Sequence, residues 1–185
     1  MKNPKLAAHF ATVLYDFATE SNNVEEIYQD ILLVQKVVTE NQELKTAIES
    51  PIIQEDKKQK VFKEIFINKI SETTFQFFSI LIKKRRVPQM LMICNQFVKI
   101  YYVRHNIKET YITTAQPLSE EMQLYLKNFI EKDSPYTFLL HFIVNQNIIG
   151  GIIVKFDDLY FDASIQTKIN KLKAEFSQNA YAVGF

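Results

Sequence analysis

Apolar side chains recur at helical spacing through roughly the first hundred residues of the chain. In the segment 54–68, for example, Val61, Phe62, Ile65 and Phe66 share one face. The predicted helices cover 6–19, 24–40, 42–49, 54–68, 72–84 and 87–101. Because the connections between them are short, six helices of this kind predict a compact bundle.

Several of these predicted helices begin or end at a recognisable signal. Asn23, with Glu26 three residues later, resembles a capping box, in which each side chain bonds to a backbone N–H of the first turn. Ser50 precedes Pro51, and the residue before a proline is disfavoured in the α region, so the third helix should end there. Ser71 is a suitable N-cap for the fifth helix.

The pattern changes near residues 104–108, where β-branched residues become frequent. The elements predicted beyond that point are a strand at 110–114, a helix at 119–132, strands at 136–144 and 148–156 joined by a hairpin at 145–147, and a helix from 162 to about 176. The predicted fold class is therefore mainly α. A six-helix bundle at 1–106 is followed by a small α/β domain at 107–185.

Two of the three glycines of the chain stand together, at Gly150 and Gly151, inside an apolar run. Glycine weakens a strand, so a pair placed there indicates a bulge, a bend or the close approach of another backbone. Soon afterwards comes Asp162, two residues before Ser164, and we predict that Asp162 is the N-cap of the last helix. This combination is an architectural signal and carries no obvious chemistry.

Charge and composition exclude several classes of protein. The chain has 22 basic and 21 acidic residues, so it lacks the overall field that would attract nucleic acid or anionic lipid. Its single cysteine excludes an intrachain disulfide and fits a reducing compartment. No apolar stretch approaches the roughly 20 residues that span a bilayer, and the first residues hold no convincing signal peptide. We therefore expect a soluble, cytoplasmic protein.

The side chains that usually carry chemistry are poorly placed for it. His9, His105 and His141 lie far apart in the sequence, and none has a second ligand at metal-binding spacing. Cys94 lies on the apolar stripe of its helix, which favours a buried, inert thiol over a nucleophile. The glycine pair matches no phosphate-binding loop. The sequence therefore predicts no catalytic residue, no cofactor and no metal.

One concentrated run of charge covers the segment Lys83-Lys84-Arg85-Arg86. A nucleic-acid patch would need further basic or aromatic neighbours, and the flanking residues do not supply them. The run lies at the predicted end of a helix, where each positive charge complements the helix dipole by about 0.3–1 kcal/mol. That structural role is favoured, and nucleic-acid binding is the alternative.

The first and fifth predicted helices are apolar on more than one side. Such a helix is either central in a core or exposes a patch to a partner, and a small bundle can hardly enclose two of them. For any single residue, burial in the core is an equally good interpretation. For the pair of helices we predict a partner-binding groove. The candidate residues are Phe10, Val13, Leu14, Phe17, Phe77, Ile80 and Leu81.

Five short motifs extend over nearly the whole chain. They are His9-Phe10-Ala11-Thr12-Val13-Leu14-Tyr15 with Ala18; Ser50-Pro51-Ile52-Ile53 with Lys57; Arg86 with Leu91, Ile93 and Phe97; Thr114-Ala115-Gln116-Pro117-Leu118-Ser119; and Ile149-Gly150-Gly151-Ile152-Ile153-Val154 with Asp162-Ala163-Ser164-Ile165. In this order and spacing they resemble the delta subunit of F-type ATP synthases, whose mitochondrial relative is the oligomycin-sensitivity-conferring protein. The chain departs from the family pattern at 9–10, 145–147 and 156–158.

This resemblance implies a non-catalytic subunit of the peripheral stalk, or stator, of a proton-transporting ATP synthase. The stalk links the membrane sector to the catalytic head and resists rotor torque during ATP synthesis. The resemblance also implies that the groove receives the N-terminal helix of an alpha subunit and that the C-terminal domain binds the end of the b subunits. Arg86 matches a basic residue of the family.

The resemblance further implies that the protein lies at the cytoplasmic face of the cell inner membrane, that it does not insert into the membrane, and that it binds no nucleic acid. The alternative function is that of a helical-bundle adaptor or regulatory protein that binds RNA through the segment 83–86. Salt separates the two, because binding to phosphates weakens steeply with salt and apolar binding of a helix does not.

Overall fold

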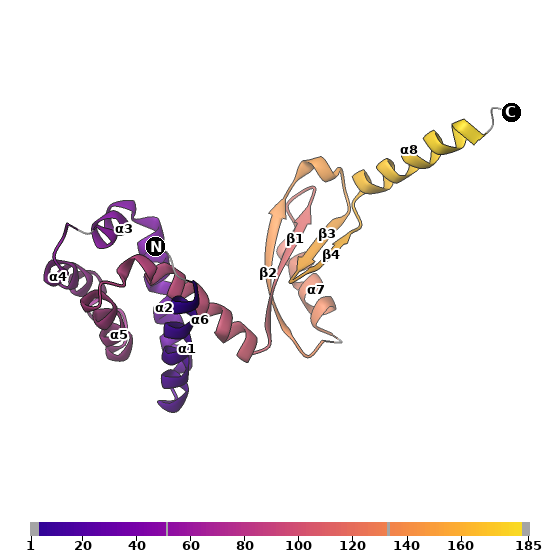
Figure 1. The fold of residues 1–185 in the computed structure, drawn as a ribbon. Helices are drawn as coiled ribbons and strands as arrows, with labels where there is room; N and C mark the ends of the chain where they lie inside the picture. The colour runs from indigo at the N-terminus through magenta and orange to yellow at the C-terminus, as the bar shows by residue number, and fades with distance from the viewer. Residues whose placement is uncertain (1–3, 51, 133, 183–185) are drawn as a thin grey trace. The chain divides into compact units, whose positions relative to one another are not determined.

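The computed structural model describes residues 4–50, 52–132 and 134–182. The chain forms two compact units that divide between Arg104 and His105, within the segment where the sequence pattern changes (Figure 1). The helices of the N-terminal unit are α1 (Pro4–Glu20), α2 (Val24–Glu40), α3 (Gln42–Glu49), α4 (Glu55–Phe66), α5 (Glu72–Lys83), the short 3-10 helix η1 (Val87–Gln89) and α6 (Met90–Arg104). The fold class is mainly α, as predicted.

The core of the N-terminal unit is made by one face of each long helix. α1 buries Ala7, Ala11 and Ala18 completely and packs against α6 and α2. Small side chains at this spacing let the helix axes approach closely. A second cluster joins α4 to α5, where the ring centroids of Phe62 and Phe78 lie 5.4 Å apart. The apolar residues that recur about every 3.6 positions in the sequence are therefore the ones that the helices bury.

Two of the predicted helix ends are confirmed and one is wrong. Ser71 caps α5, since its hydroxyl oxygen accepts a hydrogen bond from the Thr74 N–H at 3.3 Å. α3 ends at Glu49, directly before Ser50. The capping box at Asn23 does not form. Asn23 precedes α2 with φ −129° and ψ 35°, outside the extended conformation in which an N-cap side chain reaches back to the first turn.

The C-terminal unit is built around a four-stranded sheet. Its elements are β1 (Ile107–Thr114), α7 (Glu120–Glu131), β2 (Thr137–Val144), the 3-10 helix η2 (Gln146–Ile148), β3 (Ile152–Phe156), β4 (Leu159–Asp162) and α8 (Ile165–Ala182). The strand order is β2-β1-β3-β4, with β1 parallel to β2 and antiparallel to β3. α7 packs against β2, and α8 extends away from the sheet (Figure 1).

The predicted hairpin between residues 136–144 and 148–156 is wrong. β2 and β3 lie on opposite sides of β1, so the connection between them crosses the end of the central strand and makes no tight turn. Ile148, expected to begin a strand, instead lies buried in η2. The hairpin of this unit joins β3 to β4, and Asp157 takes a positive φ of 46° in its turn.

Candidate partner-binding site

The two apolar stripes of α1 have different surroundings. The stripe of Ala7, Ala11, Leu14 and Ala18 is buried in the core. On the neighbouring stripe, Val13 and Phe17 are each 50% exposed. One face of α1 therefore holds the unit together, while the next presents large apolar side chains to solvent.

α5 divides in the same way. Phe78, Leu81 and Ile82 are fully buried, whereas Ile80 is 48% exposed. Phe77 is half-buried, and its ring lies 5.5 Å from that of Phe78 in an edge-to-face arrangement. The inner face of α5 thus supports the residues that face outward.

A groove of about 250 Å³ lies between these exposed faces of α1 and α5. It is lined by Val13, Leu14, Phe17, Thr73, Gln76, Phe77 and Ile80. Of the two polar lining residues, Gln76 donates a hydrogen bond from Nε2 to Glu72 Oε1 at 3.1 Å. Both polar lining residues belong to α5, so the groove is apolar apart from a polar strip on the α5 side.

The structure brings together five of the seven predicted groove residues: Val13, Leu14, Phe17, Phe77 and Ile80. Phe10 lies on the same stripe of α1 but is half-buried and outside the lining. The prediction is wrong for Leu81, which does not line the groove. Leu81 follows Ile80 around α5 to the inner face, where it is fully buried like Phe78. Thr73 and Gln76 were missed. They lie seven and four residues before Ile80, on the same face of α5, but their side chains are polar and an apolar pattern does not include them.

The glycine pair lies at the base of α8 and not inside a strand. Gly151 directly precedes β3 with a φ of +81°, and a Cβ atom there would lie 2.4 Å from the carbonyl oxygen of Ala163. Backbone hydrogen bonds join Ile165 N to Gly150 O and Ala163 N to Ile152 O, each at 2.9 Å. Of the three reasons that the sequence left open, a bulge, a bend or the close approach of another backbone, the structure shows the close approach at Gly151. The predicted place of the pair within a strand is wrong.

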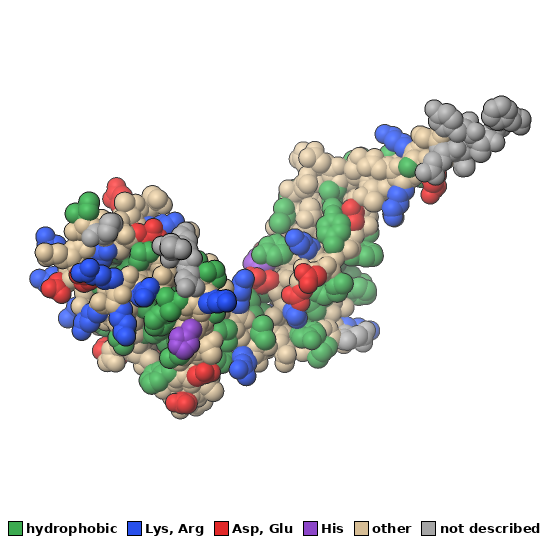
Figure 2. Space-filling model, viewed as in Figure 1, with side chains coloured by type: hydrophobic (Ala, Val, Ile, Leu, Met, Phe, Trp, Pro, Cys, Tyr) green, Lys and Arg blue, Asp and Glu red, His purple; other side chains and the backbone are tan. Residues whose placement is uncertain are grey.

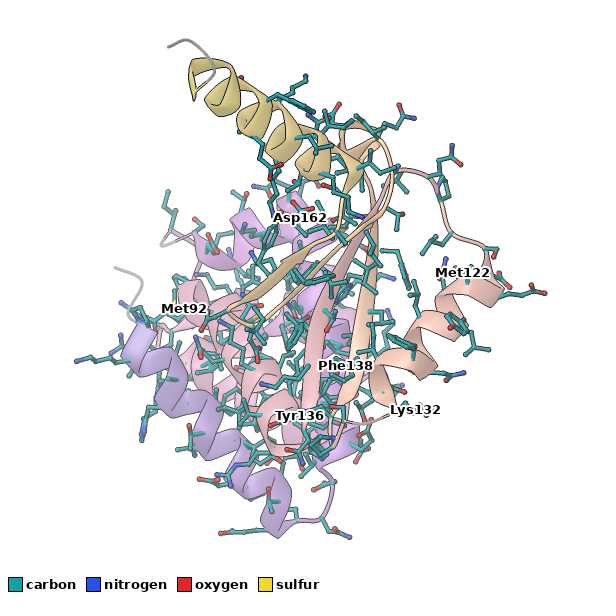
Figure 3. The ribbon with its side chains drawn as sticks, turned by 90° about the vertical axis from the view of Figure 1, so that its right-hand side faces the viewer. Met92, Met122, Lys132, Tyr136, Phe138 and Asp162 are labelled. Carbon is teal, nitrogen blue, oxygen red and sulfur yellow. The ribbon has the colours of Figure 1, made fainter. Side chains whose placement is uncertain are left out.

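The N-cap of α8 is Ser164 and not Asp162. α8 begins at Ile165, and the Ser164 hydroxyl accepts a hydrogen bond from the Thr167 N–H at 3.2 Å. Asp162 lies two residues before Ser164, at the end of β4 (Figure 3). Its Oδ1 accepts a hydrogen bond from the Ser164 N–H and its Oδ2 one from the Thr167 hydroxyl, each at 2.8 Å. Together with the glycine pair, these bonds fix the first turn of α8 to the sheet.

Comparison with known proteins decides the family. The family model described as ATP synthase delta (OSCP) subunit matches residues 6–176. The chain belongs to the ATP synthase delta (OSCP) family. It is 31% identical to ATP synthase subunit delta of Rickettsia bellii, over 98% of this chain and 97% of that protein. It is 29% identical to the Cytophaga hutchinsonii subunit, over 96% and 97% of the two chains.

A solved structure shows the same fold. A chain in the cryo-EM structure of the Toxoplasma gondii mitochondrial ATP synthase hexamer superposes with a TM-score of 0.69 at 19% identity. The alignment covers 92% of this chain and 97% of that chain. The delta (OSCP) subunit is a structural, non-catalytic component of ATP synthase, as the sequence motifs implied.

The basic run 83–86 has a structural place in this delta subunit. α5 ends at Lys83, and Arg85 forms an ion pair with Glu55 on α4, with Nε and Oε1 2.7 Å apart. The backbone N–H of Arg86 bonds to the carbonyl of Leu81 at 2.8 Å and closes the end of α5, while the Arg86 side chain is exposed. The basic run therefore forms the C-terminal end of α5 and the turn that follows it.

Cys94 is fully buried, and this burial raises the pKa of its thiol to about 12. The thiol is thus protonated at neutral pH, as its place on the apolar stripe predicted. His9 and His105 are exposed, and His141 lies on β2 with its ring stacked on that of Tyr111 at 4.9 Å. Among the residues that the structure describes, no group of three or more His, Cys, Asp or Glu could hold a metal ion.

Acid should loosen the base of α8. Hydrogen bonds from Ser164 and then Thr167 hold the pKa of Asp162 below the ordinary value of 3.8 for an aspartate. A carboxylate whose pKa is depressed in the folded state stabilises the fold above its unfolded pKa, and this contribution is lost as the pH falls through the folded value. We therefore expect the difference in melting temperature between the wild type and Asp162→Ala to be largest at about pH 7 and to shrink as the pH falls below 3.8, where the carboxylate becomes protonated.

That difference is measured by thermal unfolding of both proteins across the pH range. The exposed Asp158 provides the control, since its substitution by alanine should leave the pH profile of the wild type unchanged. If the difference in melting temperature between the wild type and Asp162→Ala persists unchanged in acid, the charge of Asp162 does not help to hold the start of α8 to the sheet.

Proposed function

We propose that this delta subunit binds the N-terminal helix of an alpha subunit in the groove between α1 and α5, and the end of the b subunits on its C-terminal unit. As a delta subunit it is part of the peripheral stalk, which links the membrane sector of the F-type ATP synthase to the catalytic head. The observation that carries the proposal is the groove itself, where half-exposed Val13, Phe17 and Ile80 surround an apolar hollow.

The shape and chemistry of the groove suit an amphipathic helix. Such a helix places apolar anchors at spacings of three and four residues, and these fill a groove between two other helices. Val13 and Phe17 on α1 and Phe77 and Ile80 on α5 repeat at the same spacings, so anchors and lining can interdigitate. Thr73 and Gln76 offer hydrogen bonds to the polar edge of the incoming helix.

The C-terminal unit offers an apolar surface to the b subunits. Side chains alternate along a strand, and the pairing of Val154 with Phe161 and of Phe156 with Leu159 puts these four on one face of the β3–β4 hairpin. Leu159 is 60% exposed and Phe161 64%. Exposed apolar side chains over this unit are visible in Figure 2.

The covering of the sheet is incomplete. A helix is about 10 Å wide and strands are about 4.8 Å apart, so one helix covers about two strands. α7 packs against β2, the edge strand furthest from β4, and none of the described side chains of α7 is buried. The open face of β3 and β4 has room for a helix, and we assign it to the end of a b subunit.

The task of such a subunit is mechanical. Rotor torque would otherwise turn the catalytic head, so the stalk needs contacts that do not slip, and buried apolar anchors provide them without any catalytic group. No helix in the part of the chain that the structure describes is long and apolar enough to cross a membrane. The subunit is a peripheral component of the membrane-associated complex, and we place it at the cytoplasmic face of the inner membrane.

Binding of the two partners tests the proposal. The full chain should bind a peptide of the alpha N-terminus and a C-terminal fragment of b from the same organism, both at once, as measured by isothermal titration calorimetry. Because both contacts are apolar, affinity should change little between low and high salt. If the chain binds neither partner but binds RNA with a steep salt dependence, the adaptor function replaces this one.

A further inference from the structure

The two helices that form the walls of the groove, α1 and α5, pack against different sets of helices. α1 packs against α6 and α2, whereas α5 packs against α4 and α2. α2 is therefore in contact with both α1 and α5, so a bond that holds α5 against α2 also helps to set the distance between α5 and α1. This distance is the width of the groove that a partner helix would enter.

A buried carboxylate on α2 makes this link. Asp30 is only 7% exposed, and its Oδ2 accepts a hydrogen bond from the Ser71 N–H at 2.8 Å and another from the Ser71 hydroxyl at 2.6 Å. A carboxylate taken out of water must be hydrogen-bonded, and one at the start of a helix is also favoured by the helix dipole. The position satisfies both conditions, because Ser71 is the N-cap of α5.

The anchored turn leads directly into the groove. Ser71 caps α5 by accepting a hydrogen bond from the N–H of Thr74, which is fully buried. Thr73, the residue before Thr74, lines the groove. Gln76 and Phe77 follow on the next turn. A displacement at Ser71 would therefore be carried by a rigid helix to the residues that a partner touches.

We infer that Asp30 is a positioning residue for the groove, holding the first turn of α5 against α2 and so setting the distance between α1 and α5. Asp30 is buried and does not line the groove, and its effect on binding rests on the proposed function. A merely stabilising residue would lower the free energy of unfolding and leave the position of α5 in the folded state unchanged. The two roles differ in the folded-state distance between the walls.

That distance can be measured in the full chain by double electron–electron resonance between spin labels at Thr12→Cys on α1 and Lys83→Cys on α5. Both positions are exposed, and the native Cys94 is buried with a raised thiol pKa, so it escapes labelling. We expect one narrow distance distribution in the wild type and a broadened or shifted one in Asp30→Ala.

Two control variants separate position from stability. Asp30→Asn keeps an oxygen that can accept both Ser71 bonds, so it should restore the narrow distribution. Ile31→Val removes one methyl group from the next residue of α2, which is fully buried, and should lower the melting temperature without changing the distance. If Asp30→Ala does not fold, Ser71→Ala takes its place, since it removes the 2.6 Å bond and should broaden the distribution as well.

The same variants are then titrated with the alpha N-terminal peptide. Asp30→Ala should bind about tenfold more weakly than the wild type, while Asp30→Asn and Ile31→Val stay close to it. An unchanged distance distribution in Asp30→Ala and Ser71→Ala overturns the inference, whatever the peptide does. Failure of the wild type to bind the peptide overturns the proposed function, and the distance measurement still decides the role of Asp30.

Discussion

Replacing Ile80 by alanine should weaken binding of the alpha N-terminal helix by roughly thirtyfold, or about 2 kcal/mol, the usual effect of truncating a central anchor of an interface. Ile80 lines the groove and is 48% exposed in the free subunit. About half of its side chain therefore remains to be buried by a partner helix, while the other half already packs within the unit. The loss should appear mainly in affinity, with a smaller effect on folding.

Phe17→Ala tests the opposite wall and should have an effect of the same size, because Phe17 also lines the groove at 50% exposure. Phe10→Ala should have a smaller effect, since Phe10 lies on the same stripe but outside the lining. Affinity is measured by calorimetry with the alpha peptide, and circular dichroism checks that the helical content is unchanged.

Ile67→Ala is the matched control. Ile67 is 51% exposed, so the truncation removes a side chain of the same size and similar exposure, but from a site that does not line the groove. It should bind the peptide like the wild type. Equal weakening by Ile67→Ala and Ile80→Ala would mean that the loss is general, and wild-type affinity in both Phe17→Ala and Ile80→Ala would place the alpha site elsewhere.

The groove could be predicted largely from the sequence because helical periodicity separates faces. The second stripe of α1 had no place in a core already filled by Ala7, Ala11 and Ala18, and it is the stripe that the structure exposes. Leu81 was misplaced because periodicity cannot decide a residue at the boundary between two faces. The contact between Asp30 and Ser71 spans 41 positions of the chain, and nothing local in the sequence indicates it.

The C-terminal unit was harder to predict because strand pairing is not local. The segments 136–144 and 148–156 are adjacent in the chain and each carries a strand, which favours a hairpin between them. β1, from before α7, occupies the place between them instead. Asp162 and Ser164 are both good capping residues two positions apart, and only the first hydrogen bonds of α8 show that Ser164 is the cap.

Gly151→Ala should destabilise the C-terminal unit by about 3 kcal/mol or more. Two effects add at this position. A φ of +81° is strained for any residue with a side chain, and the new Cβ would lie 2.4 Å from the Ala163 carbonyl oxygen, a backbone atom that can move only if the start of α8 moves with it. Gly151→Val should cost still more, because a β-branched side chain tolerates a positive φ poorly.

Gly150→Ala is the control that the chain itself offers. A Cβ at Gly150 would lie 2.7 Å from Cδ1 of Ile165, the far end of a flexible side chain, and the structure gives no positive φ there. Rotation of Ile165 can relieve that contact, so the cost should stay below about 1 kcal/mol. Urea unfolding of the full chain, followed through amide resonances of β1 and β3, gives the free energy of unfolding for the C-terminal unit. If Gly150→Ala proves as costly as Gly151→Ala, or if neither is costly, then the backbone contact between Gly151 and Ala163 does not hold α8 to the sheet.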